Sequence, residues 1–225
     1  MRRLTALVVW CACAAPLVAQ SPLGSTPADK GYWEIRPGLG GVPRAADVPM
    51  QDWARALYQY RVGKTDLYPP LVRCKPAGGP GFFNAPGFEI VEAPDLQKVF
   101  ILNIAGPHSW RVVHMDGRTH PAKPRPTFLG HSIGRWEGTT LVIDSVGFNE
   151  KQWLVGAFPT TDQLHLVERI SRPNVKTLAY EATIDDPGAY TKPWTVRWTI
   201  TEKSASSWIP GGEIFEYICQ DDLKD

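Results

Sequence analysis

One carboxylate lies in an otherwise apolar row near the middle of the chain. The stretch Gly130–Phe148 predicts a β-hairpin, because Gly138 can adopt the positive φ of a tight turn and the flanks are rich in β-branched and aromatic residues. Strand alternation places Asp144 on one face with Val142 and Val146, where a core residue is expected. A carboxylate in apolar surroundings is a candidate for acid–base chemistry, because desolvation and neighbouring charges shift its pKa.

A second carboxylate also lies in an apolar row of a predicted strand. In the predicted strand 163–171, Glu168 shares a face with three apolar residues. His131 lies in the first strand of the hairpin, just upstream of Arg135, and a histidine can carry a proton near neutral pH. We therefore predict Asp144, Glu168 and His131 as candidate catalytic residues for general acid–base work.

Arginines and indole rings accompany these residues. If the strands neighbour one another, their inward groups would form a mixed acid and base cluster with flat apolar walls suited to a small organic ligand. A purely structural alternative stays open, in which an arginine pairs with Asp144 or Glu168 because a buried carboxylate needs a partner. The candidate ligand-binding residues are Arg135, Trp136, Arg197, Trp198, Asn103 and Tyr190.

No metal or cofactor is predicted. His108, His114 and His120 are spaced by six, and six residues of strand span about 20 Å, too far to share an ion. Only a turn at Asp116-Gly117 could fold His114 back towards His120, and the Pro-rich run after His120 predicts a surface loop. The chain has no HExxH, Gly-x-Ser-x-Gly, Walker or dinucleotide motif.

The first 19 residues predict a secretory signal peptide. Arg2 and Arg3 precede an apolar run that is short for a membrane span, and cleavage is expected near Ala19. We expect a periplasmic or extracellular protein with no integral membrane segment after processing. Removing two arginines lowers Lys+Arg from 24 to 22 against 23 Asp+Glu, which leaves a near-neutral surface and argues against a nucleic-acid partner.

Two cysteines remain after processing, Cys74 and Cys219. In an oxidising compartment they predict one disulfide, and a catalytic thiol or a metal pair is the alternative.

The pattern of apolar residues predicts a mainly β fold. Residues 20–49 are Gly- and Pro-rich and predict an extended lead, followed by a single β-rich domain over 50–225. Met50–Tyr60 predicts one helix that ends at Gly63 and packs its apolar side against a larger structural unit of the protein. We expect an antiparallel meander closed as a barrel, or packed as a sandwich, with the helix capping one mouth. The predicted strands are 88–92, 98–104, 110–115, 128–136, 140–146, 163–171, 177–184, 194–201 and 213–219.

Several of these segments together resemble a large family of exported bacterial proteins. The most specific have the forms GHSxGRWEGxTLVxDxxGF, at Gly130–Phe148, and IDDPxAYTKPW, at Ile184–Trp194. The resemblance covers nearly all of the mature chain, implies export, one domain and cysteines ready to pair, and assigns no catalytic residue. Where the family often has a Pro-His-Thr-Glu-like run, this chain has Pro159–Asp162 (Pro-Thr-Thr-Asp), which argues against a histidine mechanism at that position.

Two functions follow from the sequence. The first is a secreted single-domain β-barrel that binds a small organic ligand in a Trp-lined pocket. The alternative is a cofactor-independent hydrolase, lyase or isomerase that uses the Asp/Glu/His cluster. A structural or surface-assembly protein is a third option.

Overall fold

The computed structural model describes residues 23, 32–35, 41–64, 70–84, 87–103 and 109–203. Their secondary structure is mainly β, with one α-helix, as the sequence predicts. The elements are β1 (Tyr32–Ile35), η1 (Ala45–Asp47), α1 (Asp52–Val62), η2 (Pro70–Arg73), η3 (Gly79–Asn84), β2 (Phe88–Ala93), η4 (Pro94–Leu96), β3 (Lys98–Asn103), β4 (Trp110–His114), β5 (His131–Glu137), β6 (Thr140–Val146), β7 (His165–Asn174), β8 (Thr177–Asp185) and β9 (Trp194–Lys203).

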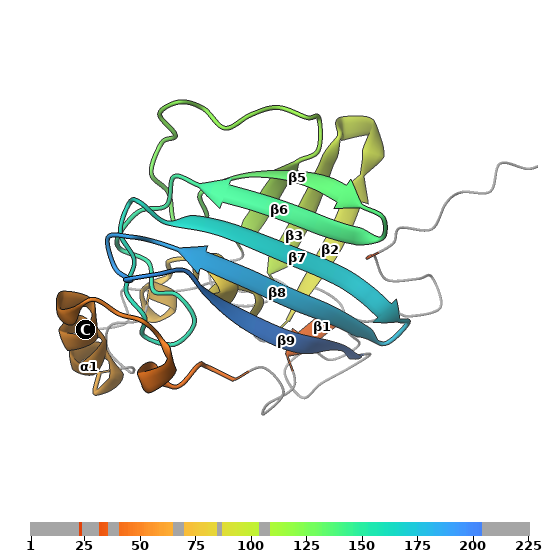
Figure 1. Ribbon diagram of the computed structural model, residues 1–225. Helices are drawn as coiled ribbons and strands as arrows, with labels where there is room; N and C mark the ends of the chain where they lie inside the picture. Colours follow the sequence, from red (N-terminus) through yellow and green to blue (C-terminus); the bar gives the residue numbers. More distant parts are fainter. Residues whose placement is uncertain are drawn as a thin grey trace, which may run out of the picture.

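The strands form a curved sheet that closes into a barrel in the order of the sequence, β1 to β9. Strands β5 to β9 pair antiparallel over long registers and make the wall that faces the viewer in Figure 1, with β2 and β3 behind it. The ring closes through β1, which pairs with β9 at four positions and with β2 at one. Closure leaves few unpaired edges, which is the reason a barrel is expected for a long meander.

One junction departs from the predicted antiparallel meander. Strands β4 and β5 run parallel and pair at only two positions, Val113 with Ser132 and His114 with Ile133. A parallel pair needs a long connection, and the irregular segment 115–130 supplies it by arching over β5, at the top of Figure 1. Because β4 ends opposite Ile133, the last four residues of β5 extend beyond it.

One strand lies within the predicted extended lead: Tyr32–Ile35 forms β1, which is not among the predicted strands. This strand has only four residues and lies among Gly and Pro, so it carries little alternation to reveal it. The predicted strand 213–219, His108 and Cys219 lie outside the described residues.

Alternating residues of the strands fill the barrel interior. Ile101, Leu141, Leu166 and Ile200 are each fully buried there. The hairpin of β5 and β6 turns at Gly138, whose φ of +61° is the left-handed conformation that the sequence predicts.

Helix α1 lies at one end of the barrel, beside the loop between β8 and β9. Gln51, just before the helix, and Trp53 in its first turn donate side-chain hydrogen bonds to the carbonyls of Pro187 and Gly188. The helix ends at Gly63, as predicted. None of the described helices has the length and apolarity that crossing a membrane requires.

Candidate functional site

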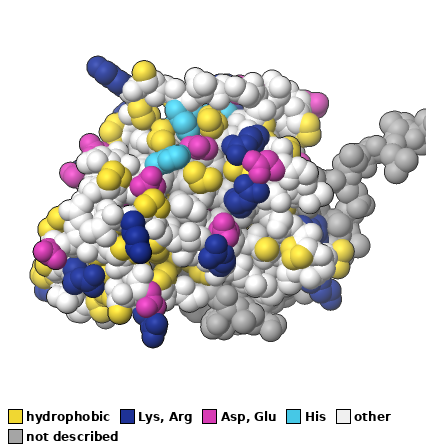
Figure 2. Space-filling model, viewed as in Figure 1, with side chains coloured by type: hydrophobic (Ala, Val, Ile, Leu, Met, Phe, Trp, Pro, Cys, Tyr) yellow, Lys and Arg dark blue, Asp and Glu magenta, His cyan; other side chains and the backbone are white. Residues whose placement is uncertain are grey.

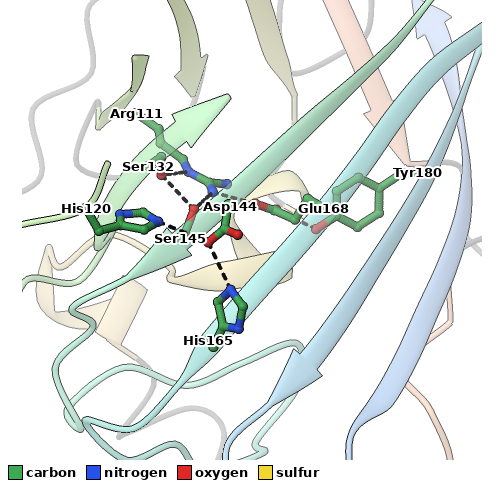
Figure 3. A network of polar contacts seen from close by, with 8 residues as sticks. All are labelled: Arg111, His120, Ser132, Asp144, Ser145, His165, Glu168 and Tyr180. Carbon is green, nitrogen blue, oxygen red and sulfur yellow. Dashed lines mark hydrogen bonds and ion pairs between the residues drawn. The ribbon is translucent and has the colours of Figure 1, made fainter. Parts of the chain in front are cut away.

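A chain of hydrogen bonds joins three histidines and one carboxylate on the outer face of the sheet. Asp144 Oδ1 lies 3.0 Å from His120 Nε2 and 2.9 Å from His165 Nε2. The other ring nitrogen of His120, Nδ1, lies 2.8 Å from His131 Nδ1. Figure 3 shows the two histidines reaching the Asp144 carboxylate from different sides. We call these four residues, together with His114, the outer histidine cluster.

His114 extends the cluster by ring stacking. Its imidazole lies 5.4 Å from that of His131, with an angle of 22° between the ring planes. Four of the five histidines of the chain therefore gather around one aspartate. Neighbouring histidine and acidic side chains are visible on the face of Figure 2.

Neighbouring strands position this cluster. His114, His131, Asp144 and His165 come from β4, β5, β6 and β7, and His120 comes from the segment that arches over β5. The side chains of His120, Asp144 and His165 are 19%, 29% and 43% exposed, so a molecule in solution can reach them.

The hydrogen-bond pattern fixes where the protons lie. A carboxylate only accepts, so both His120 and His165 carry a proton on Nε2. In neutral His120 the remaining nitrogen, Nδ1, then accepts from the Nδ1–H of His131. Nε2 of His131 and Nδ1 of His165 are left as unprotonated nitrogens, so each can act as a base.

Two members of the cluster have a lowered pKa. For His131 the main cause is burial, followed by the nearby groups of His120, His114 and Arg118, whose protonated forms repel a proton on its ring. For His114 the main causes are burial and then Arg118. At neutral pH both rings are therefore uncharged, which keeps Nε2 of His131 free to accept a proton.

A second polar network lies on the inner side of the same strands. Arg111 forms an ion pair with Glu168 through Nη2 and donates to the hydroxyls of Ser132, at 3.0 Å, and Ser145, at 2.7 Å. Tyr180 donates its hydroxyl to Glu168 at 2.7 Å. These residues come from β4 to β8, and Figure 3 shows them beside the outer cluster. We call them the inner arginine network.

The inner arginine network is deeply buried. The side chains of Arg111 and Glu168 are 3% and 0% exposed. Burial, and next the charge of Glu168, raises the pKa of the Tyr180 hydroxyl well above its ordinary value, so Tyr180 remains a donor. This buried pair joins β4 to β7, and the Glu168 side chain has no exposed surface through which a substrate could reach it.

The predicted single cluster is wrong, because the sheet separates its members. Glu168 faces inward as predicted, whereas Asp144 faces outward and belongs to the outer histidine cluster. The alternation in β6 was correct, but the inward row is Leu141, Ile143 and Ser145. The inward assignment of Asp144 depended on its apolar neighbours on the same face, Val142 and Val146. Val142 is indeed fully buried, but it lies on the outer face of the sheet.

The two predicted arginines pair with neither Asp144 nor Glu168. Arg135 pairs with Glu137 at 2.6 Å and Arg197 with Glu181 at 2.7 Å, both on the exposed outer face. The partner of Glu168 is instead Arg111, a residue with apolar neighbours in β4 that sequence reasoning missed.

The other predicted ligand-binding residues are mostly packed in the core. Trp198 stacks on Tyr180 at 5.2 Å between ring centroids. Asn103 donates to the carbonyl of Phe82 at 3.0 Å, and Tyr190 donates its hydroxyl to the carbonyl of Pro159 at 2.6 Å. Trp136 is only partly buried and packs against the edge of the core.

Shallow hollows open at two places on the surface that the described residues form. One, of about 430 Å³, lies over β7 to β9 and is bordered by Arg169, Glu181 and Arg197. The other, of about 350 Å³, lies where β3 and β5 diverge and is lined by Arg135 and Trp136.

Sequence reasoning also missed His120 and His165. His120 was assigned to a surface loop, and its Pro-rich segment gives no period from which its position could be read. His165 lies three residues before Glu168, and this odd spacing is the one signal in the sequence that places it on the opposite face of the strand from Glu168. Within the described part of the chain, no three His, Cys, Asp or Glu side chains are arranged to hold a metal ion.

Comparisons of the chain with protein-family models, with curated proteins and with solved structures find no match, so the resemblance to an exported bacterial family remains a prediction.

Proposed function

We propose that this chain is an exported protein that performs general acid–base catalysis, without a cofactor, on a small organic substrate at the outer histidine cluster. The reaction classes that need only such groups are hydrolysis, elimination and isomerisation. One observation carries the proposal, namely that a single oxygen of Asp144 accepts from two histidines while His120 also contacts His131.

The proton path follows from the tautomers. A substrate proton is taken by Nε2 of His131, and the Nδ1 proton of His131 passes to Nδ1 of His120. His120 then carries a positive charge directly beside the Asp144 carboxylate, at 3.0 Å, which stabilises it. The reverse path returns the proton to the product. His165 offers a shorter proton path of the same kind, because its Nε2 contacts Asp144 and its side chain is 43% exposed.

The lowered pKa of His131 suits this role. A general base must be unprotonated at the working pH, and burial keeps His131 neutral at pH 7. The inner arginine network supports the cluster, because Ser132 and Ser145 are the immediate neighbours of His131 and Asp144 in the chain.

The experiment uses the mature protein with two probes. Hydrolysis is measured with p-nitrophenyl acetate, and proton abstraction with deuterium uptake from D₂O into small ketones, since elimination and isomerisation next to a carbonyl begin with that step. Asp144→Asn is expected to lower either rate by about 10²- to 10⁴-fold. Glu181→Gln, an outward carboxylate outside the cluster, is the matched control and is expected to retain full activity.

The rate on the active probe is also expected to fall in acid, at a pH below the ordinary histidine value of about 6.5, because the lowered pKa of His131 delays the protonation that ends its action as a base. Absence of turnover on both probes, or equal rates for Asp144→Asn and Glu181→Gln, would contradict the proposal.

Export and the disulfide belong to the same proposal. The positive residues and apolar run at the start of the chain support cleavage near Ala19, and Cys74 and Cys219 support a bridge formed in an oxidising compartment. Intact-mass spectrometry of protein recovered from the periplasm tests both, with a chain that begins at Gln20 and a gain of about 2 Da on reduction as the expected results.

A further inference from the structure

The hollow between β3 and β5 is a consequence of the parallel junction. Strand β4 ends at His114, so β5 continues from Gly134 to Glu137 without a β4 neighbour. The turn between β2 and β3 forms the opposite wall, and Met115 and Gly117 close the gap at the end of β4. We call this hollow of about 350 Å³ the seam pocket.

One wall of the seam pocket is flat and apolar. Trp136 and Met115 are partly buried and pack against the core, and Val99 behind them is 2% exposed. Gly134 allows the side chains of Met115 and Val113 to pack closely against the β5 backbone, since a Cβ there would lie 2.6 Å from Met115 Sδ and from Val113 Cγ1. An indole beside a thioether is a suitable surface for an aromatic ring.

The rim of the seam pocket carries charge. Lys98 and Arg135 contribute two cations, and Glu92 contributes one carboxylate, which lies 3.5 Å from the backbone N–H of Leu23. Arg135 is held in place by Glu137 through Nε and Nη2. Because Glu137 already offsets the charge of Arg135, Lys98 is the lining cation that can attract an anion.

We propose that the seam pocket binds a small aromatic carboxylate, with its ring on Trp136 and its carboxylate directed to Lys98. This binding does not depend on the proposed acid–base activity, although the two sites are neighbours. Lys98 is the cross-strand partner of His114, and His114 stacks on His131. A ligand in the seam pocket therefore lies beside the outer histidine cluster.

The experiment measures binding alone. Naphthalene-2-carboxylate and its neutral amide are titrated into the mature protein by calorimetry, and the indole N–H resonance of Trp136 is followed by NMR. The carboxylate is expected to bind and to shift that resonance. Trp136→Ala is expected to weaken binding by at least about 10-fold, whereas Trp136→Phe, which keeps a ring, loses less than about 3-fold.

A second substitution tests whether Lys98 recognises the negative charge of the ligand. Lys98→Gln is expected to weaken binding of the carboxylate by about 3- to 5-fold and to leave binding of the amide unchanged, as an exposed ion pair implies. Trp110→Ala is the matched control, because Trp110 is 63% exposed on β4 and does not line the pocket.

Three results would overturn the proposal: no heat and no shift with either probe at millimolar concentration, unchanged affinity in Trp136→Ala, or an equal loss in Trp110→Ala. Because no turnover is measured, an inactive histidine cluster leaves this outcome unaffected.

Discussion

Asp144 and Ser145 are consecutive residues of β6, yet their side chains belong to different networks on opposite sides of the sheet. The Asp144 carboxylate accepts from His120 and His165 on the outside, whereas the Ser145 hydroxyl accepts from Arg111 at 2.7 Å on the inside. Strand geometry enforces this separation, because successive side chains point to opposite faces. One strand thereby joins a solvent-reachable acid–base cluster to a buried ion pair that fixes its backbone.

The two branches of the outer histidine cluster can be separated by substitution. His120→Gln removes the link between Asp144 and His131, whereas His165→Gln leaves that link intact. If His131 is the base, His120→Gln lowers kcat by about 10- to 100-fold and His165→Gln by less than about 3-fold. Steady-state kinetics on whichever probe the protein turns over decides this, and the opposite ranking would make His165 the base.

The lowered pKa of His131 and His114 predicts a stability that depends on pH. In the unfolded chain both imidazoles titrate near 6.5, and in the folded chain at a lower pH, chiefly because they are buried. Between the folded and the unfolded pKa the unfolded state binds more protons. The unfolding free energy therefore has its full value above about pH 6.5 and decreases as the pH drops below that value.

Urea denaturation from pH 5 to pH 8 measures this dependence. The slope between pH 5 and 6.5 is expected to flatten in His131→Gln. A wild-type curve that is level over that range would contradict burial of these rings.

The inner arginine network predicts a large loss of stability on breaking one ion pair. Glu168→Gln leaves Arg111 buried without its counter-charge, which costs about 3 to 5 kcal/mol of unfolding free energy. The matched substitution Glu181→Gln breaks an exposed pair with Arg197 and is expected to cost less than about 1 kcal/mol. Denaturant titration of both variants gives the comparison, and similar losses would show that burial of the pair has no effect.

Gly134 predicts a packing constraint at the parallel junction. A methyl group there would lie 2.6 Å from Val113 Cγ1 and Met115 Sδ, so Gly134→Ala is expected to cost about 1 to 3 kcal/mol. Gly41, where an added Cβ meets nothing within 4 Å, provides the control, and Gly41→Ala is expected to be nearly neutral. Thermal unfolding of the two variants checks the difference, and an unchanged melting temperature for Gly134→Ala would refute it.

The predicted strands match the described ones closely where alternation is strong. The hairpin of β5 and β6 was placed to within three residues, with its turn at Gly138, because β-branched residues and one glycine mark it clearly. Strand β1 and the parallel pairing of β4 were missed, since a strand of four residues carries little pattern and strand direction is set by the path of a loop.

The amino-acid sequence by itself determined a mainly β chain with one helix, the burial of Glu168 and the face that each residue of a strand shares with its neighbours. These depend on the period of two along a strand, which is local. Only the tertiary structure decided that Asp144 faces outward, that His120 returns to meet it and that Arg111 is the partner of Glu168. These depend on which strands become neighbours and which face of the sheet closes inward, and both follow from the packing of residues that are far apart in the chain.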